Sequence, residues 1–252
     1  ECLADSVCRS WQLCILGCGT SNTSLPCQIR CADLHKPTDS KSAVIDKFSE
    51  CVFPEHHCVP PSHGHCKPPV NVPSLPAFDV RTFAPEANTT WYITRGDNPM
   101  FDCFDCQVHH FTVDPADPAG KILHGALAYQ VREDLHCSPP NCTYLQRKVF
   151  QSWSVDASNS AHLMNHNNTL AELHYSDDWW VLAHKPDSYI LIYYCGCNDA
   201  SCDYGGAVLY TKKPRYDLPA EDVSLLSAAI KDAGVEFTLE SMCTPSYAAC
   251  NS

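Results

Sequence analysis

Eighteen cysteines in 252 residues constrain this chain more than any other feature of its sequence. Such a density is typical of proteins that fold in an oxidising compartment, where cysteines form disulfides. The number is even, so every cysteine could be paired, although the connectivity does not follow from counting. We therefore expect a fold that disulfides hold together, outside the reducing cytosol.

Nine of the cysteines lie in the first 66 residues, where their spacing predicts a helical hairpin. Cys14 and Cys18 are four residues apart, as are Cys27 and Cys31, so each pair lies on one face of a helix. The residues between the pairs are rich in Gly, Ser, Asn and Pro and predict a turn. Antiparallel helices would align Cys14 with Cys31 and Cys18 with Cys27 as two disulfides. Zinc is the alternative for a four-cysteine cluster, but two-residue spacing suits it better.

Six prolines between residues 59 and 76 indicate a domain boundary, because proline is excluded from helix interiors and central strands. We expect a Cys-rich helical-hairpin domain at 1–66 and a proline-rich linker at 67–85. Within the first domain, Cys51 and Cys58 could close a small loop.

From residue 86 the sequence changes to short apolar runs separated by turn signals such as DNP, DPADPAG and YGG. The runs fit strands at 91–95, 106–113, 124–131, 146–153, 170–175, 178–184, 189–195 and 206–211. So many short strands favour a sandwich or barrel. An amphipathic helix near 219–234, which Gly234 would end, could pack on the barrel wall.

The predicted fold class is therefore mainly β. We expect an eight-stranded lipocalin-type barrel at 86–216, with a flanking C-terminal helix and a Cys-containing tail at 217–252. Such a barrel can hold one elongated apolar ligand.

Two adjacent carboxylates, Asp177 and Asp178, interrupt the aromatic segment HYSDDWW. Side chains alternate along a strand, so only one of the two can enter the barrel, and Tyr175 and Trp179 share the face of Asp177. An acid inside an apolar barrel must be paired or protonated, and a protonated carboxyl is what a general acid requires. The alternative is that both acids end a strand as solvated turn residues.

Other polar side chains could converge on the same interior. They are Asp102, Asp105, Gln107, His109, Tyr194 and Tyr210. Such a cluster in an aromatic barrel is a reasonable proton-transfer site, although tyrosines at barrel rims more often pack than react. The spacing of Cys103 and Cys106 resembles a redox dithiol, but no βαβ pattern surrounds it, so a structural disulfide role is favoured.

The formal charge of −12, from 17 basic and 29 acidic residues, argues against nucleic-acid binding. Protonation of all 13 histidines would nearly cancel that charge and favour association in mild acid, unless several of them are buried and never titrate. No apolar run reaches 18 residues, so no membrane span is expected, and the first residues do not resemble a targeting segment. Motifs for nucleotide binding and serine hydrolysis are missing from the sequence.

Several ordered motifs resemble one known family. They are TWYITRGDNPMFDCFDCQVHHF, NHNNTLAELHYSDDWW and YILIYYCGCNDASCDYGGAVLYT, with PCQIRCADL and SECVFPEHHCVPP nearer the N-terminus. These motifs resemble the violaxanthin de-epoxidase family over about residues 2–245. The resemblance implies a lipocalin barrel after a disulfide-rich helical domain, located in the chloroplast thylakoid lumen. It also implies homodimer formation and binding to thylakoid membrane lipid at acidic pH.

The resemblance further implies that the substrate is the carotenoid violaxanthin, that ascorbate is the reducing co-substrate, and that antheraxanthin and zeaxanthin are the products. No metal or nucleotide cofactor is expected. The implied catalytic residues are Asp177, Tyr194 and Tyr210. The substrate-binding candidates are Asp102, Asp105, Gln107, His109, Tyr175 and Trp179. The family's pH-sensing histidines match His109, His166 and His174, and its barrel disulfide matches Cys106 with Cys243.

The chain also departs from the family pattern. Cys195 and Cys197 replace two basic residues, and an arginine of the third strand is missing near Gln130. These changes bear on ascorbate, because an anionic reductant requires positive charge nearby. Three functions therefore stand: a reductive de-epoxidase, a redox-neutral isomerase that converts violaxanthin to neoxanthin, and a non-catalytic carotenoid-binding or photosynthetic-complex subunit.

Overall fold

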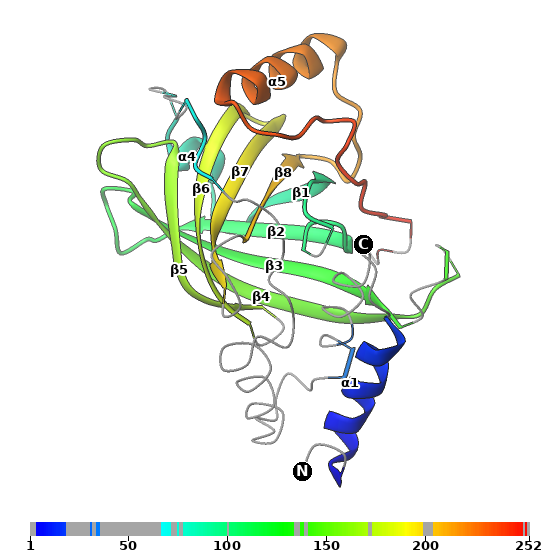
Figure 1. Ribbon diagram of the computed structural model, residues 1–252. Helices are drawn as coiled ribbons and strands as arrows, with labels where there is room; N and C mark the ends of the chain where they lie inside the picture. The colour runs from blue at the N-terminus through cyan, green and yellow to red at the C-terminus, as the bar shows by residue number, and fades with distance from the viewer. Residues whose placement is uncertain are drawn as a thin grey trace.

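Eight strands in the computed structural model form a closed antiparallel barrel in which each strand pairs with the next and β8 pairs with β1 (Figure 1). The structure describes residues 4–18, 31, 34–35, 67–71, 75, 78–99, 101–133, 137–138, 141–170, 173–198, 204–248 and 250. The strands are β1 Thr89–Gly96, β2 Asp105–Val113, β3 Ile122–Arg132, β4 Tyr144–Val155, β5 His162–Leu170, β6 Leu173–Lys185, β7 Tyr189–Asn198 and β8 Tyr204–Thr211. The predicted lipocalin-type barrel is thus confirmed.

One predicted strand is wrong. The segment 170–175 was expected to form a single strand, but β5 ends at Leu170 and β6 begins at Leu173. The real β5 is the polar sequence HLMNHNNTL, whose asparagines are poor strand formers. Its pairing with β6 and β4 overrides that propensity.

Short helices flank the barrel. Helix α1, Ser6–Gly17, begins at Asp5, whose carboxylate accepts hydrogen bonds from the amides of Val7 and Cys8. Cys14 on this helix forms the expected disulfide with Cys31, at a Cα–Cα distance of 5.7 Å. Most of the second predicted helix lies outside the described residues, and so do Cys27, Cys51 and Cys58 of the predicted pairs Cys18–Cys27 and Cys51–Cys58. Helix α4, Val80–Phe83, packs its Phe83 ring on Trp91 and Phe111 inside the barrel.

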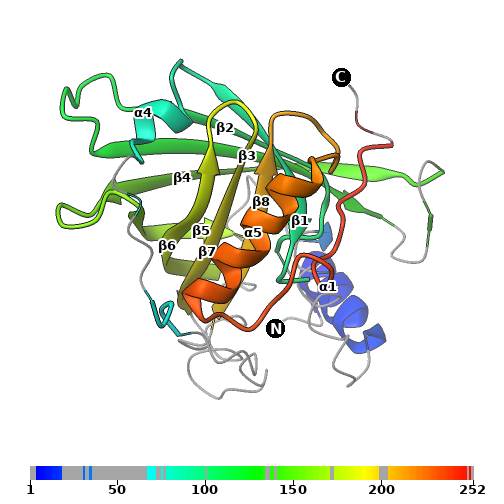
Figure 2. The ribbon, with the colours of Figure 1, turned by 90° about the horizontal axis from the view of Figure 1, so that it is seen from above.

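Helix α5, Ala220–Ala233, lies against the outer face of β6, β7 and β8 (Figure 2). Leu226 and Ile230 of α5 pack there with Trp180 of β6. As predicted, the helix ends at Gly234, which adopts the left-handed conformation with φ of 68°. None of the described helices is long and apolar enough to cross a membrane.

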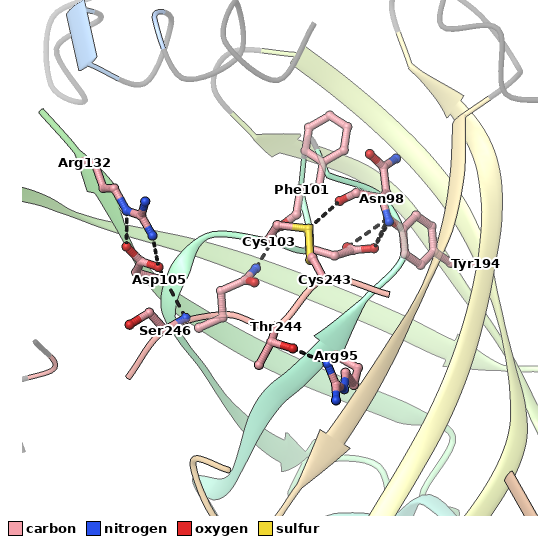
Figure 3. Close-up of a disulfide and its surroundings, with 12 residues drawn as sticks. Arg95, Asn98, Phe101, Cys103, Asp105, Arg132, Tyr194, Cys243, Thr244 and Ser246 are labelled. Atoms are coloured by element: carbon pink, nitrogen blue, oxygen red, sulfur yellow. Dashed lines mark hydrogen bonds and ion pairs between the residues drawn. A yellow bond between two sulfur atoms is a disulfide. The ribbon is translucent and has the colours of Figure 1, made fainter. Parts of the chain in front are cut away.

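Two disulfides fasten the C-terminal segment to the start of β2, and they differ from the predicted Cys106–Cys243 pair. Cys103 bonds to Cys243 (Figure 3). Cys106 bonds to Cys250. Cys243 exchanges two backbone hydrogen bonds with Gly96 of β1, which holds it beside Cys103. The amide of Cys106 instead donates to the carbonyl of Ser246, so Cys106 faces a later part of the tail. The predicted Cys106–Cys243 pair is therefore wrong, because each of these two cysteines bonds to a different partner.

Candidate active site

The barrel encloses a small cavity of about 50 Å³, which is room for a few water molecules. Its polar lining residues are Asp102, Gln107, Gln151, Tyr175, Asp177, Tyr194 and Tyr210. Its apolar lining residues are Ile93, Phe101, Leu127, Val149, Trp179 and Val208. Among the described residues, the lining includes no lysine or arginine. The lining thus combines apolar surface with acids, phenols and amides that can form hydrogen bonds to a ligand, and a ring-sized group would require lining side chains to move.

Asp177 is a buried acid in the cavity lining, and two hydrogen-bond donors hold its carboxyl group. Its side chain is 4% exposed and accepts a hydrogen bond from the Asn165 amide at 2.7 Å and one from the Trp179 indole at 3.1 Å. Burial raises the pKa of Asp177 to about 7, against the opposing effect of the two donors. The carboxyl can therefore hold a proton in mild acid, and the donors stabilise the carboxylate that remains after the proton is transferred.

Strand alternation separates Asp177 from its neighbour, as predicted. Tyr175, Asp177 and Trp179 line the cavity, whereas Asp178 has a side chain that is 38% exposed on the outer face. There, Asp178 lies 3.6 Å from the Nε2 atom of His162. Only one of the two adjacent acids is thus available to a ligand in the barrel.

Tyr175 is held by a residue that the sequence did not single out. The Gln151 amide of β4 donates a hydrogen bond to the Tyr175 hydroxyl at 2.7 Å. Burial raises the pKa of Tyr175 above its ordinary value, and the charge of Asp177 adds to the effect. Tyr175 therefore remains a neutral phenol beside the catalytic candidate Asp177.

A second buried acid, Asp102, faces the same cavity. Both of its carboxyl oxygens accept from the Tyr194 hydroxyl at 2.9 Å, and the amide of Asn98 donates to it at 2.9 Å (Figure 3). Burial raises the pKa of Asp102 well above its ordinary value, although these hydrogen bonds lower it. Gly206 makes room for the pair, because a Cβ atom there would lie 2.5 Å from the Tyr194 hydroxyl oxygen.

Gln107 lines the cavity and carries a buried hydrogen-bond acceptor. Its amide nitrogen donates to the carbonyl of Phe101 at 2.8 Å, which fixes the orientation of the side chain, because a carbonyl oxygen only accepts. The Oε1 atom is buried and has no hydrogen-bond partner among the described residues. A ligand hydroxyl could donate a hydrogen bond to this oxygen.

Asp105, also expected at the substrate, lies away from the cavity lining. It forms a two-point ion pair with Arg132 of β3, at 2.6 and 2.9 Å, and accepts from the amide of Ser246 (Figure 3). Its carboxylate is thus engaged in fastening β2, β3 and the C-terminal segment together. The role of Arg132 as the partner of Asp105 was not predicted, because comparison with the family pattern suggested that the arginine of this strand was missing near Gln130.

His109 does not line the cavity but lies behind a residue that does. Its Nδ1 atom is 3.0 Å from the hydroxyl oxygen of Tyr210. The structure therefore brings together Asp102, Gln107, Tyr175, Asp177, Trp179, Tyr194 and Tyr210 at one cavity, with His109 in contact behind it. The side chains of His166 and His174 lie outside the described residues.

Asn165 is the other contributor that the sequence did not single out. It lies in the motif NHNNTLAELHY and pairs with Asp177 across β5 and β6. Only the register of the two strands shows this partnership, and β5 was not predicted.

Among the described residues, no group of histidine, cysteine and acidic side chains is arranged to hold a metal ion.

Comparison with known proteins gives one consistent result. A family model described as the VDE lipocalin domain matches residues 1–245. Violaxanthin de-epoxidase of Spinacia oleracea, described as chloroplastic, is 34% identical over 243 residues, which are 94% of this chain and 46% of that protein. The Arabidopsis thaliana enzyme of the same name is 33% identical over 244 residues, covering 94% of this chain and 48% of that protein. The chain thus spans about half the length of these relatives.

Solved structures also resemble the barrel. Apocrustacyanin C2 superimposes with a TM-score of 0.46 and 13% identity over 69% of this chain and 81% of its own. Lobster apocrustacyanin A1 gives a TM-score of 0.44 and 15% identity over 70% of this chain and 90% of its own.

Proposed function

Because this chain belongs to the VDE lipocalin domain family, we propose that it opens the epoxide ring of violaxanthin by acid catalysis, in the manner of a de-epoxidase. The observation that carries the proposal is the environment of Asp177. A buried carboxyl with a pKa raised to about 7 is protonated in mild acid, where a proton donor to an epoxide oxygen is needed.

The first step follows from the contacts of Asp177. The carboxyl donates its proton to the epoxide oxygen, and one C–O bond breaks with its electron pair going to that oxygen. The Asn165 amide and the Trp179 indole already face the two carboxyl oxygens, so they stabilise the carboxylate as it forms. A ligand that fills the cavity displaces water from it, which strengthens these contacts and limits hydrolysis of the opened ring.

Reductive de-epoxidation requires two electrons and two protons for each epoxide, and its products are an alkene and water. In the proposed reaction, ascorbate supplies the electrons and is oxidised to dehydroascorbate. Ascorbate, as its monoanion, also releases one proton as it is oxidised, and Asp177 supplies the other and later regains a proton from solvent. The oxygen that was protonated leaves as water.

A second candidate function is favoured by the lack of positive charge around the cavity. Among the described lining residues there is no lysine or arginine for anionic ascorbate, and Arg132 of β3 is already paired with Asp105. Isomerisation of violaxanthin to neoxanthin needs no reductant. It begins with the same acid-assisted opening and ends with loss of a proton to give an allene.

The proposal includes an acidic chloroplast compartment, the thylakoid lumen. Acid would protonate Asp177 and would also reduce the net negative charge of −12. Weaker self-repulsion supports binding to thylakoid membrane lipid and the formation of a homodimer at low pH, both of which are part of the proposal.

One incubation separates the candidates. The protein would be mixed with violaxanthin at about pH 5, with and without ascorbate, and the pigments separated by chromatography. We expect antheraxanthin and zeaxanthin only with ascorbate, and no product from the Asp177→Asn variant. Formation of neoxanthin without ascorbate would show that the protein is the isomerase and not the reductive de-epoxidase. Binding without any turnover would leave only a carotenoid-binding subunit.

A further inference from the structure

His109 is a fully buried histidine whose ring lies among aromatic side chains. It is 0% exposed, and its ring centroid lies 4.0 Å from that of Phe111 and 5.7 Å from that of Trp153. Its Nδ1 atom contacts the Tyr210 hydroxyl oxygen at 3.0 Å. Tyr210 lines the cavity and His109 does not, so any effect of His109 on a ligand acts through Tyr210.

The other ring nitrogen determines where the imidazole proton lies. Nε2 is buried and has no hydrogen-bond partner among the described residues. Space beside it exists because residue 125 is glycine, where a Cβ atom would lie 2.5 Å from Nε2 and 2.6 Å from the Trp153 ring. A buried N–H without an acceptor is rarer and more costly than a buried lone pair without a donor. Tyr210 lines the cavity and can direct its own proton to a molecule there, whereas His109 does not line the cavity, so the proton of neutral His109 is placed on Nδ1.

This tautomer fixes the direction of the contact with Tyr210. An Nδ1–H group donates to the tyrosine oxygen, so the tyrosine's own proton is directed elsewhere. We propose that His109 is a positioning residue that holds the Tyr210 hydroxyl as a hydrogen-bond donor toward a ligand oxygen in the cavity. Identifying that oxygen as the epoxide oxygen rests on the proposed function, whereas the direction of the hydrogen bond does not.

The surroundings of Tyr210 and His109 support the role of Tyr210 as a hydrogen-bond donor to the ligand. Burial raises the pKa of Tyr210 well above its ordinary value, and the charges of Asp102 and Asp177 add to the effect, so Tyr210 keeps its proton. Burial holds the pKa of His109 well below its ordinary value, and the neighbouring His110 lowers it further. The rings of Phe111, Trp153, Trp179 and Tyr210 face His109.

His109 is thus expected to remain neutral in the pH range where a sensor would titrate. The side chain of His110 points to the opposite face and contacts the Thr90 hydroxyl at 2.9 Å. With Asp177 as proton donor, the Tyr210 hydroxyl adds a second donor to the oxygen on which negative charge develops.

Nitrogen-15 NMR of histidine-labelled full-length protein tests the tautomer without any assay of turnover. The His109 signals would be assigned from their loss in the His109→Gln variant. We expect a protonated Nδ1 and a bare Nε2 from about pH 5 to pH 8, and a shifted Nδ1 signal in the Tyr210→Phe variant. An Nε2–H tautomer, or titration of the ring within this range, would overturn the proposal.

Kinetics test the consequence. The His109→Phe variant keeps the aromatic volume but removes the donor, so we expect kcat to fall roughly 10- to 100-fold with little change in KM. The Tyr210→Phe variant should remove the benefit of His109, so the double variant should be no worse than Tyr210→Phe. His109→Gln, which can still donate, should recover part of the activity.

Additive losses in the double variant would overturn the positioning role. If the wild-type protein turns over no epoxide, the proposed function fails, and the NMR result alone decides the role of His109.

Discussion

Asn165 and Asp177 face each other across β5 and β6, and the Asn165 amide donates to the Asp177 carboxyl at 2.7 Å. The same carboxyl is buried in the barrel, which raises its pKa to about 7. The two effects oppose each other, because burial disfavours the carboxylate and the amide donor favours it. The balance leaves an acid that can both give up and recover a proton near neutral pH.

Replacing Asn165 by leucine should therefore raise the pKa of Asp177 further. Loss of one hydrogen bond to a charged group corresponds to a shift of roughly one unit. The alkaline limb of the pH–activity profile should move upward by about one unit, since the proposed mechanism requires Asp177 in its protonated form. The Asp178→Asn variant, on the outer face, is the matched control and should shift the limb slightly downward, because it removes a nearby negative charge. An alkaline limb that does not move in Asn165→Leu would show that another group controls it.

The raised pKa of Asp177 also has a cost in stability. The unfolded chain releases this proton near 3.8, whereas the folded protein holds it to about 7. Folding stability from this group is thus lost as the pH rises between these values, by up to ~4 kcal/mol. The Asp177→Asn variant lacks this loss because asparagine does not titrate.

Urea unfolding of both proteins at about pH 4 and about pH 8 measures the effect. The stability of Asp177→Asn relative to the wild type should increase between the two pH values. A difference that is the same at both would mean that Asp177 ionises like an exposed aspartate.

The sequence was most informative where a single element determines the outcome. Strand alternation put one of Asp177 and Asp178 inside the barrel, and apolar periodicity with Gly234 placed α5. It was least informative where two distant segments meet. Asn165 reaches Asp177 only through the β5–β6 register, and Arg132 reaches Asp105 only through the β2–β3 pairing.

The cysteine error has the same origin. The Cys106–Cys243 pair was implied by the family resemblance, and cysteine spacing along the chain does not distinguish Cys103 from Cys106 as the partner of Cys243. Backbone pairing decides the choice, because Gly96 holds Cys243 and Ser246 contacts Cys106. Such pairing depends on long-range contacts that no local pattern encodes.

The two C-terminal disulfides should stabilise the protein non-additively. Each closes a chain loop of more than 100 residues, with sequence separations of 140 and 144. When one bond is already present, the second closes a loop of only about ten residues, which is worth ~3 kcal/mol by chain entropy. We expect the double variant Cys103→Ser/Cys243→Ser to lose ~3 kcal/mol of folding stability, and the double variant Cys106→Ser/Cys250→Ser to lose a similar amount.

Removing both bonds releases the long loop as well, so the fourfold variant should lose ~5 kcal/mol more than either pair alone. The Cys137–Cys142 disulfide, with a separation of five residues, provides the control, and its removal should cost ~2 kcal/mol. Urea denaturation checks all four variants. Equal and strictly additive losses would show that local packing, and not chain entropy, determines the contribution of each bond.

Gln107 should distinguish ligands by a single hydroxyl. Its Oε1 atom is a buried acceptor in the cavity lining without a partner among the described residues, and a ligand hydroxyl can supply the missing proton. The Gln107→Met variant keeps the side-chain length but removes the acceptor. We expect it to bind a hydroxylated carotenoid epoxide about 10-fold more weakly, which corresponds to one hydrogen bond, and a carotenoid epoxide without the hydroxyl no more weakly than the wild type does. Trp179 lines the same cavity, so quenching of tryptophan fluorescence reports binding directly. Equal weakening for both ligands would assign the effect to lost packing around Phe101, because the Gln107 amide also donates to the carbonyl of that residue.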